Sequence, residues 1–314
     1  IRPMMKRLLG LAAAAAMGFA GAAQAFPEKE ITLLIPYGPG GGFDTVSRKI
    51  APKLEEILGV EVVPTNMPGA NGRKAATYMM RQPADGHTIM IFNIPGHGLG
   101  QIRGEDVGYD IGEVTWLGQV GQDGYVVLSA ASNDEIKTFE DVAKLGRTIK
   151  IPDQGPSSTS HMANQITWST AGVPFEFISG YKSSQDYTTA VLRGDGDLTM
   201  VVSGSAARYN ANGDFNVLAE FSDNKQFPDA PDGEALGHPD LNLLGLRRVL
   251  GGPPGMPADV VETWSNAILE AVNDPEIQAW AAETGNPMPA LGAEATEAAV
   301  QRTFDFFTKF ADVM

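Results

Sequence analysis

The sequence predicts an α/β protein with two lobes and a cleft between them. Short apolar, β-branched runs alternate with runs whose apolar residues recur at helical spacing, which is typical of α/β folds with mostly parallel sheets. The alternation occurs in two sets, residues 31–92 and 148–219, so we expect one α/β unit from each set. Two more apolar stretches, near residues 125–128 and 243–249, are expected to carry the chain from one lobe to the other and back.

The elements follow one another in a regular order. The expected strands are residues 31–35, 61–63, 88–92, 148–151, 175–178, 198–202 and 217–219. The first expected helix runs through Val46, Ile50, Leu54 and Leu58, with Gly59 as its C-cap, and a short second helix at 187–191 is ended by Gly194. Two more helices are expected in the last quarter of the chain, one with Pro257 in its first turn and one that restarts at Asp274. The last expected helix has Val300, Phe304, Phe307 and Ala311 on one face. Pro52 is expected to kink the first helix, because proline lacks an N–H group.

The first 25 residues are typical of a secretory signal peptide. A basic start is followed by an apolar, alanine-rich stretch at 8–23, and the small-residue motif Ala23-Gln24-Ala25 indicates a cleavage site. A membrane anchor is the alternative, but the apolar stretch is short for a span and rich in small residues. We therefore expect residues 1–25 to be removed by cleavage after Ala25.

The composition excludes several functional classes. The chain has 314 residues, a net charge of −15 and no cysteine. A strongly acidic protein is a poor match for nucleic acid or for an anionic membrane surface. Without cysteine there is no disulfide, no thiol nucleophile and no thiolate metal site. The four histidines are scattered without metal-ligand spacing, so we expect neither a metal nor a cofactor.

The stretch IPYGPGGGFDTVSRKI, residues 35–50, joins the first expected strand to the first helix through a glycine-rich turn. N–H groups at a helix start lack intrahelical partners, the helix dipole favours negative charge there, and glycines let a ligand approach the backbone. The phosphate-binding Walker pattern does not fit, because it needs Lys and then Ser or Thr after its last glycine, and here Phe43 and Asp44 follow Gly42. The dinucleotide-binding pattern does not fit either, because Phe43 stands where its last glycine is needed. The turn therefore predicts a carboxylate site, since local backbone donors can override the acidic net charge.

Asp44 has two interpretations. It is expected to cap the helix by accepting from N–H groups two or three residues on, since a carboxylate aimed into an anion site would repel the ligand. That role is compatible with a contact to a hydroxyl or ammonium group of a ligand.

A second helix start has a similar composition. In IPDQGPSSTSHM an expected strand leads into Gln154, Gly155, Pro156, Ser157, Ser158, Thr159, Ser160 and His161. Four hydroxyls at a helix start supply more donors than capping requires. A plain capped helix is the alternative for this segment alone. Two such starts, one per lobe, predict that each holds part of an acidic ligand across the cleft.

A hydrolase is the competing interpretation from a different class, with Asp44 or His161 as the reactive group. Ser160 and His161 are neighbours, and neighbouring residues on a helix point about 100° apart, which prevents a hydrogen bond between nucleophile and base. The G-x-S-x-G elbow and the calcium-loop pattern are both absent from the sequence. We therefore do not expect an enzyme.

A third, turn-rich segment, NMPGANGR at residues 66–73, precedes an alanine-rich stretch that we expect to be helical. The segment is otherwise typical of a surface loop in which Asn71 caps that helix. Arg73 is a candidate to bind a carboxylate through two of its N–H donors. The alternative is that Arg73 is an ordinary exposed arginine.

Taken in order, these motifs resemble the substrate-binding receptors of tripartite tricarboxylate transporters, also called the Bug family. The stretch IPYGPGGGFDTVSRKI is similar to that family's VPF-x-PGGG-x-D-x-x-AR run, NMPGANG to its E-N-x-PGAGG segment, and PADGHTI to its PDGYTL segment. The runs SSTSHM, GYKSSQDYTTAVLRGDGDLTM and GGPPGMPADVVETWSNAILEAVNDPEI resemble later motifs of the family. The resemblance covers essentially the whole chain after residue 25.

The resemblance implies a periplasmic receptor with the type II periplasmic-binding-protein fold, a two-lobed Venus flytrap without catalysis. We expect lobe 1 from residues 26–125 and 245–314, and an inserted lobe 2 from residues 126–244. A small organic acid, such as a dicarboxylate or tricarboxylate, would bind in the interlobe cleft, and the monomeric receptor would deliver it to a two-subunit membrane permease. A sensor that reports the ligand to a signalling kinase is the alternative within the same class.

The resemblance also implies where the ligand is held, partly through ordered water. The implied contacts are Tyr37, Gly41, Gly42, Phe43 and Asp44 at the first helix start, Ser158, Thr159, Ser160 and His161 at the second, and Asn66, Ala70 and Ser203 at the cleft floor. The chain departs from the family pattern at Phe43, where Thr or Ser is frequent, at Asn71 and Arg73, and at Ser183-Ser184. We hypothesise that Phe43 favours an apolar or aromatic acid and that Arg73 meets a second carboxylate.

Overall fold

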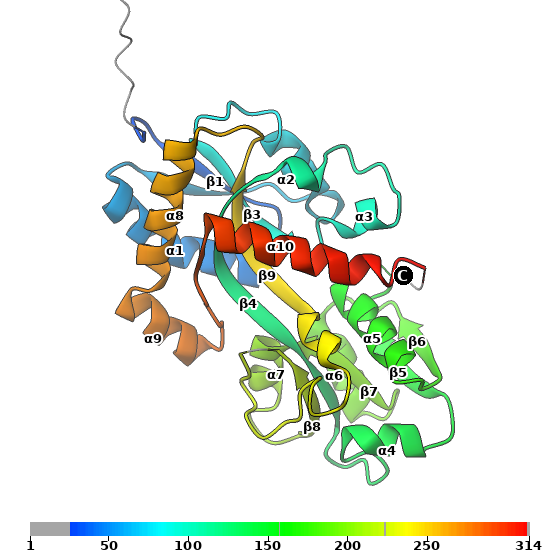
Figure 1. The fold of residues 1–314 in the computed structure, drawn as a ribbon. Coiled ribbons are helices and arrows are strands. Elements are labelled where there is room, and N and C mark those ends of the chain that lie inside the picture. The colour runs from blue at the N-terminus through cyan, green and yellow to red at the C-terminus, as the bar shows by residue number, and fades with distance from the viewer. Residues whose placement is uncertain (1–25, 157, 223, 313–314) are drawn as a thin grey trace, which may run out of the picture.

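The structure, a computed structural model, describes residues 26–312 except 157 and 223, so the expected signal peptide lies outside the described residues. The described chain forms two α/β lobes (Figure 1). Lobe 1 contains β1 (Ile31–Ile35), α1 (Gly42–Leu58), β2 (Val62–Asn66), η1 (Ala70–Gly72), α2 (Arg73–Met79), β3 (Thr88–Ile94), α3 (Leu99–Ile102), η2 (Ile111–Glu113), α8 (Ala258–Val272), α9 (Pro275–Thr284), β10 (Leu291–Gly292) and α10 (Ala293–Thr308).

Lobe 2 is built from the middle of the chain. Its elements are α4 (Phe139–Lys144), β5 (Ile149–Asp153), α5 (Thr159–Thr170), β6 (Phe175–Ser179), α6 (Ser184–Leu192), β7 (Leu198–Val202), α7 (Ser203–Tyr209), β8 (Phe215–Phe221) and η3 (Pro239–Leu243). Two long strands, β4 (Thr115–Ala130) and β9 (Gly245–Gly252), connect the lobes and run between them in Figure 1.

Strand β4 belongs to both lobes. Up to Gly124 it pairs with β9, and from Tyr125 onward it pairs with β7 and β8. The stretch expected near residues 125–128 to carry the chain across lies in this strand, and β9 returns the chain close to the expected 243–249. The expected lobe boundaries fall at this switch of partners and remain a prediction.

The sheet is less parallel than the sequence predicts. Strand β1 pairs in parallel with β2 and β3, and β5 pairs in parallel with β6, as βαβ units require. Every pairing of β4 and β9 is antiparallel, and the path of the large sheet is β10-β4-β9-β3-β1-β2. The expectation of mostly parallel sheets was wrong, because the two connecting strands run in opposite directions through the middle of the sheet.

Helices cover both faces of the lobe 1 sheet. Leu33 of β1 packs in the core cluster that includes α1 and α8, whereas its neighbour Leu34 packs in the cluster that includes α2 and α10. Successive side chains of a strand point to opposite faces, so a strand buried on both faces must be apolar at every position that packs. This explains why Leu33 and Leu34, which face opposite sides of the sheet, are both apolar, whereas Thr32 is only half-buried.

The predicted elements agree well with the structure in lobe 1. Val46, Ile50 and Leu54 of α1 are fully buried, and Gly59 ends the helix with a left-handed φ of 71°. Pro52 lies inside α1 without ending it.

The last helix differs from its prediction. In α10, Phe306 and Phe307 are buried, whereas Phe304 is half-buried and Ala311 lies beyond the helix end. Val300 packs in the lobe 1 core, but Phe306 and Phe307 pack in the lobe 2 core. The buried face therefore changes along α10, because the helix passes from one lobe to the other.

Candidate functional site

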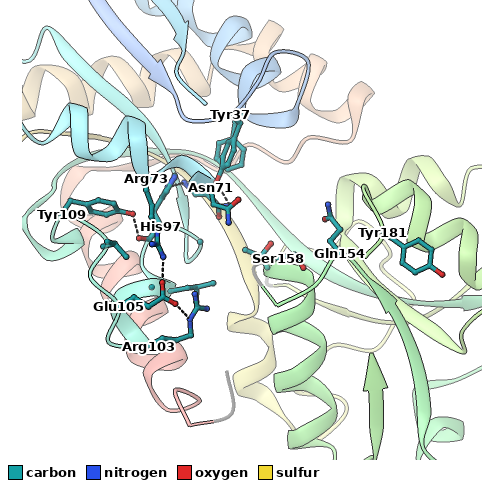
Figure 2. Close-up of a pocket in the computed structure, with 17 residues that line it drawn as sticks. Tyr37, Asn71, Arg73, His97, Arg103, Glu105, Tyr109, Gln154, Ser158 and Tyr181 are labelled. Atoms are coloured by element: carbon teal, nitrogen blue, oxygen red, sulfur yellow. Dashed lines mark hydrogen bonds and ion pairs between the residues drawn. The ribbon is translucent and has the colours of Figure 1, made fainter. Parts of the chain in front are cut away.

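A cavity of about 640 Å³ lies between the lobes, and Figure 2 shows the side chains that line it. Most of the lining belongs to lobe 1, with Tyr37, Phe43, Asn71, Arg73, Asn93, Gly96, His97, Leu99, Gly100, Arg103, Glu105, Val107 and Tyr109. Lobe 2 contributes Gln154, Ser158, Thr159 and Tyr181. The cavity is thus the interlobe cleft that the sequence predicts.

The start of α5 forms the lobe 2 wall of the cleft. Ser158 is the N-cap, and its Oγ accepts a hydrogen bond of 3.2 Å from the backbone N–H of His161. The N–H groups of Thr159 and Ser160 precede the first intrahelical bond, so they are donors available to an anion. The Thr159 hydroxyl accepts from the buried Tyr125 hydroxyl at 2.7 Å, which holds the first turn against β4.

The start of α1 faces the same cleft from lobe 1. Its N-cap is Gly41, so no side chain caps the helix. A Cβ on Gly42 would lie 3.2 Å from a guanidinium nitrogen of Arg248, so the backbone approaches that arginine closely. Phe43 lines the cleft, and its ring packs against Tyr37 with ring centroids 4.9 Å apart.

The prediction that Asp44 caps α1 from the N-cap position was wrong. Asp44 is the third residue of the helix, and its carboxylate reaches back to accept from the N–H of Gly40 at 2.9 Å. It also accepts from Arg48 Nε at 2.9 Å and from Asn66 Nδ2 at 3.0 Å. Burial opposes ionisation, but these three donors outweigh it and hold the pKa of Asp44 below 3.8. The carboxylate therefore fixes the glycine turn instead of facing the cleft.

In the segment 66–73, Asn66 supports the glycine-rich turn and does not line the cleft. Its Nδ2 also donates to the carbonyl of Tyr37 at 3.0 Å. The predicted cap at Asn71 was wrong, because α2 begins at Arg73 with Gly72 as its N-cap. Ala70 and Asn71 both have left-handed backbones (φ 47° and 52°), which places the Asn71 side chain at the cleft wall.

Three polar side chains form a neutral floor. Asn93 Nδ2 donates to the Tyr37 hydroxyl at 3.1 Å, and burial raises the pKa of Tyr37 to about 12. His97 Nδ1 accepts from the Asn93 N–H at 2.9 Å, so the neutral ring carries its proton on Nε2. Among the described residues, Asn93 Oδ1 and His97 Nε2 are buried without a hydrogen-bond partner. Buried polar atoms of this kind are expected to be satisfied by water or by a ligand.

Acidification from about pH 6.5 to about pH 5 is expected to cost about 2 kcal/mol of unfolding free energy through His97. Burial lowers the pKa of His97 from 6.5 to about 3, so below pH 6.5 the unfolded chain takes up a proton that the folded protein does not. The contribution of the neutral ring is therefore complete above pH 6.5 and decreases as the pH falls toward 3. Urea unfolding at a series of pH values measures this slope.

A matched pair of variants separates the contribution of His97 to this pH dependence from that of other groups. His97→Asn retains an acceptor for the Asn93 N–H and should flatten the slope between about pH 6.5 and pH 5. Tyr109→Phe removes only a 2.6 Å hydrogen bond to the His97 carbonyl and should keep the wild-type slope. A wild-type slope in His97→Asn would contradict the assignment.

Charged side chains gather at the lobe 1 end of the cleft. The Glu105 carboxylate pairs with Arg103 Nε at 2.9 Å and with Arg73 Nη2 (Figure 2). Hydrogen bonds from Arg103 and then Arg73 hold the pKa of Glu105 below its ordinary value. Arg73 therefore lines the cleft, where the protein's own Glu105 carboxylate already pairs with it, and its contact with a ligand stays a prediction.

A buried ion pair joins the two connecting strands behind the cleft. Asp123 of β4 pairs with Arg248 of β9, and the two side chains are 1% and 6% exposed. The Arg248 guanidinium lies over the Phe43 ring at 5.3 Å, and Asp123 accepts from the N–H of Gly204 at 3.4 Å. The pair thus contacts the first turns of α1 in lobe 1 and α7 in lobe 2.

The cleft contains some of the predicted residues and lacks others. Tyr37, Phe43, Arg73, Ser158 and Thr159 line it. Gly41, Gly42, Asp44, Asn66, Ala70, Ser160, His161 and Ser203 are not among its lining residues. His161, for example, pairs through Nδ1 with Asp153 and stacks on Phe177 with ring centroids 3.7 Å apart. Ser203 is fully buried at the start of α7.

Sequence reasoning missed several lining residues. These are Asn71, Asn93, Gly96, His97, Leu99, Gly100, Arg103, Glu105, Val107, Tyr109, Gln154 and Tyr181. Asn71, Gln154 and Tyr181 lie within motifs identified in the sequence, and could have been included. The segment 93–109 carries no motif or periodicity that points to a site.

Two further classes of site are absent from the part of the chain that the structure describes. No group of His, Asp and Glu side chains there is arranged to hold a metal ion. Among the same residues, no helix has the length and apolarity needed to cross a membrane.

The comparisons with known proteins agree with the resemblance. The model of the tripartite tricarboxylate transporter family receptor matches residues 46–303. The "UPF0065 protein in tcbD-tcbE intergenic region" of Pseudomonas sp. (strain P51) is 26% identical over 276 residues, covering 81% of this chain and 76% of the relative.

Solved structures with the same architecture cover nearly the whole chain. A TctC solute binding protein from Polaromonas, solved without ligand, has a TM-score of 0.80 at 20% identity and covers 92% of this chain and 100% of its own. MatC from Rhodopseudomonas palustris, solved with bound malate, has a TM-score of 0.71 at 20% identity, covering 92% of this chain and 99% of its own. The predicted two-lobed type II periplasmic-binding-protein fold is thereby confirmed.

Proposed function

The chain belongs to the tripartite tricarboxylate transporter family of receptors, and from this premise we propose that its interlobe cleft binds a small organic carboxylate. Receptors of this family bind solutes and are not enzymes, so the hydrolase interpretation is wrong. We further propose that the chain acts in the periplasm, with cleavage after Ala25, and delivers its acid to a membrane permease as a monomer. MatC, a relative in fold, was solved with malate, which supports a carboxylate as the class of ligand.

The observation that carries this proposal is the set of donors around one cavity. The first turn of α5 lines the cleft from lobe 2 with Ser158 and Thr159, and the uncapped first turn of α1 reaches the cleft from lobe 1 through Phe43. Helix starts attract anions through their unpaired N–H groups and their dipoles. The Nε2–H of His97, which lines the cleft and has no hydrogen-bond partner among the described residues, is a further neutral donor.

Closure of the two lobes on the acid is part of the proposal. The ligand would contact lobe 1 and lobe 2 together, so it would favour the conformation in which both walls reach it. The connecting strands β4 and β9 would bend at the partner switch near Gly124, and the proposed lobes are residues 26–125 with 245–314, and 126–244.

Thermal unfolding against a panel of organic acids is expected to identify the ligand class. A ligand at a hundredfold its dissociation constant adds about 2.7 kcal/mol to the unfolding free energy. For a protein of this size that corresponds to an upward shift of roughly 5–10 °C in Tm. The protein should first be unfolded and refolded, which removes any acid that was purified with it.

The amides of the same acids are the control. They keep the size and shape of each acid but lack the negative charge that the helix starts would hold. No shift with any acid, or equal shifts with acids and amides, would contradict carboxylate binding.

A further inference from the structure

The charged end of the cleft has a defined composition. Among the described residues that line the cavity, the ionised side chains are Arg73, Arg103 and Glu105, because burial keeps His97 neutral. Two guanidinium groups and one carboxylate leave this end with one net positive charge. Tyr109, beside Arg73, adds no charge, since burial raises its pKa to about 12.

The geometry of this charged end is fixed by the backbone. Arg103 and Glu105 lie on the tight turn that ends α3, in which the Glu105 N–H donates to the Gly100 carbonyl at 2.8 Å and the Arg103 N–H donates to the Leu99 carbonyl at 3.1 Å. A Cβ on Gly100 would lie 3.0 Å from Arg73 Nη2 and 3.3 Å from Glu105 Oε2, so the backbone supports the pair directly.

Glu105 holds both arginines but leaves most of their donors unused. One carboxylate oxygen accepts from Arg103 and the other from Arg73. Each guanidinium carries five N–H donors, and the contacts with Glu105 involve one nitrogen of each. The three side chains are 28–39% exposed, so a ligand in the cleft can reach them. The remaining donors match the planar fork that a second carboxylate needs.

We propose that Arg73, Glu105 and Arg103 limit the ligand to one negative charge beyond the carboxylate held at α5, so that the receptor binds dicarboxylates in preference to tricarboxylates. This inference rests on the proposed function. The second carboxylate neutralises the single net positive charge, and Glu105 repels a third. A ligand ammonium group is disfavoured here, because both oxygens of Glu105 are engaged and the two guanidinium groups repel it.

Glu105 is a positioning residue in this account. Two neighbouring arginines repel each other and lose side-chain entropy when they are held together, and a shared carboxylate offsets both costs. The Glu105 carboxylate also lowers the net positive charge of the site from two to one. Removing the negative charge of Glu105 should therefore change which acids bind, an effect that a purely structural role would not produce.

The experiment is isothermal titration of the wild type and of Glu105→Gln with butyrate, succinate and propane-1,2,3-tricarboxylate, at a pH where all carboxyl groups are ionised. Glu105→Gln is expected to raise the affinity for the tricarboxylate relative to succinate by about tenfold or more. Glu113→Gln, which removes the same charge from an exposed position outside the cavity, should leave this ratio unchanged.

A second variant keeps the test independent of Glu105. Arg103→Gln should weaken succinate relative to butyrate by about tenfold or more, because a charge-assisted hydrogen bond is lost. Unchanged ratios in Glu105→Gln and Arg103→Gln would overturn the inference while leaving carboxylate binding intact. Failure of the wild type to bind any of the three acids would overturn the inference as well. The absence of a thermal shift with every acid of the larger panel would overturn the proposed function.

Discussion

Replacing Asp123 with alanine is expected to lower the unfolding free energy by about 3–5 kcal/mol, which is roughly 6–20 °C in Tm. Asp123 is 1% exposed in its pair with Arg248, so its removal leaves a buried guanidinium without a compensating charge. That guanidinium has few alternatives among the described residues, since its Nε is already buried without a partner. Thermal unfolding of the variant measures the loss directly.

Two further variants distinguish the buried charge from the mere loss of a side chain. The double variant Asp123→Leu with Arg248→Met should recover much of the stability, because a buried ion pair can be replaced by packed apolar side chains at little cost. Asp240→Ala breaks the exposed pair with Lys309 and should hardly change Tm. A wild-type Tm for Asp123→Ala would mean that the stability of the connecting strands β4 and β9 does not depend on this pair.

Thr159→Pro is expected to weaken binding of the acid by about 10- to 150-fold, because it removes one backbone N–H that would hold the carboxylate. The fold should tolerate this change. Thr159 is the first residue of α5, where proline is favoured, and Ser158 before it has the extended backbone (φ −90°, ψ 146°) that precedes proline. Isothermal titration with the acid that gives the largest thermal shift measures the loss.

Thr159→Ala is the matched control. It removes the hydroxyl and its 2.7 Å bond with Tyr125 but keeps the backbone N–H. It should therefore bind the acid far more tightly than Thr159→Pro does. Equal affinities in the two variants would remove the α5 amide from the account of binding.

Much of the lobe architecture could be predicted from local sequence patterns. Val46, Ile50 and Leu54 repeat at helical spacing and are buried together, because a helix that packs on a sheet presents one face. The 16-residue strand β4 could not be predicted in full, since the part before Tyr125 contains Gly118, Gln119 and Asp123. Gln119 and Asp123 are polar because they bond to residues distant in the sequence, Gln119 Nε2 to the Pro289 carbonyl at 3.0 Å and Asp123 to Arg248. Gly118 is small because a Cβ there would lie 2.9 Å from Ile268.

Some residues of the candidate site could likewise be predicted from the sequence, and others could not. Ser158 and Thr159 could be predicted, because a strand that leads into a hydroxyl-rich helix start is a local signal with a physical meaning. Glu105 could not be predicted, because its role depends on Arg73, which is 32 residues away in the chain. In the sequence, Arg103 and Glu105 look like charges on a surface turn, and only the packing of that turn against α2 brings them to the cleft.

The most direct test of the central claim is a crystal structure of the protein with the acid that gives the largest thermal shift. The account predicts one carboxylate at the first turn of α5, with oxygens about 2.7–3.2 Å from the backbone N–H groups of Thr159 and Ser160. It predicts the second carboxylate beside Arg73 and Arg103. An acid bound outside the interlobe cleft, or one whose carboxylate does not contact the α5 start, would contradict the account.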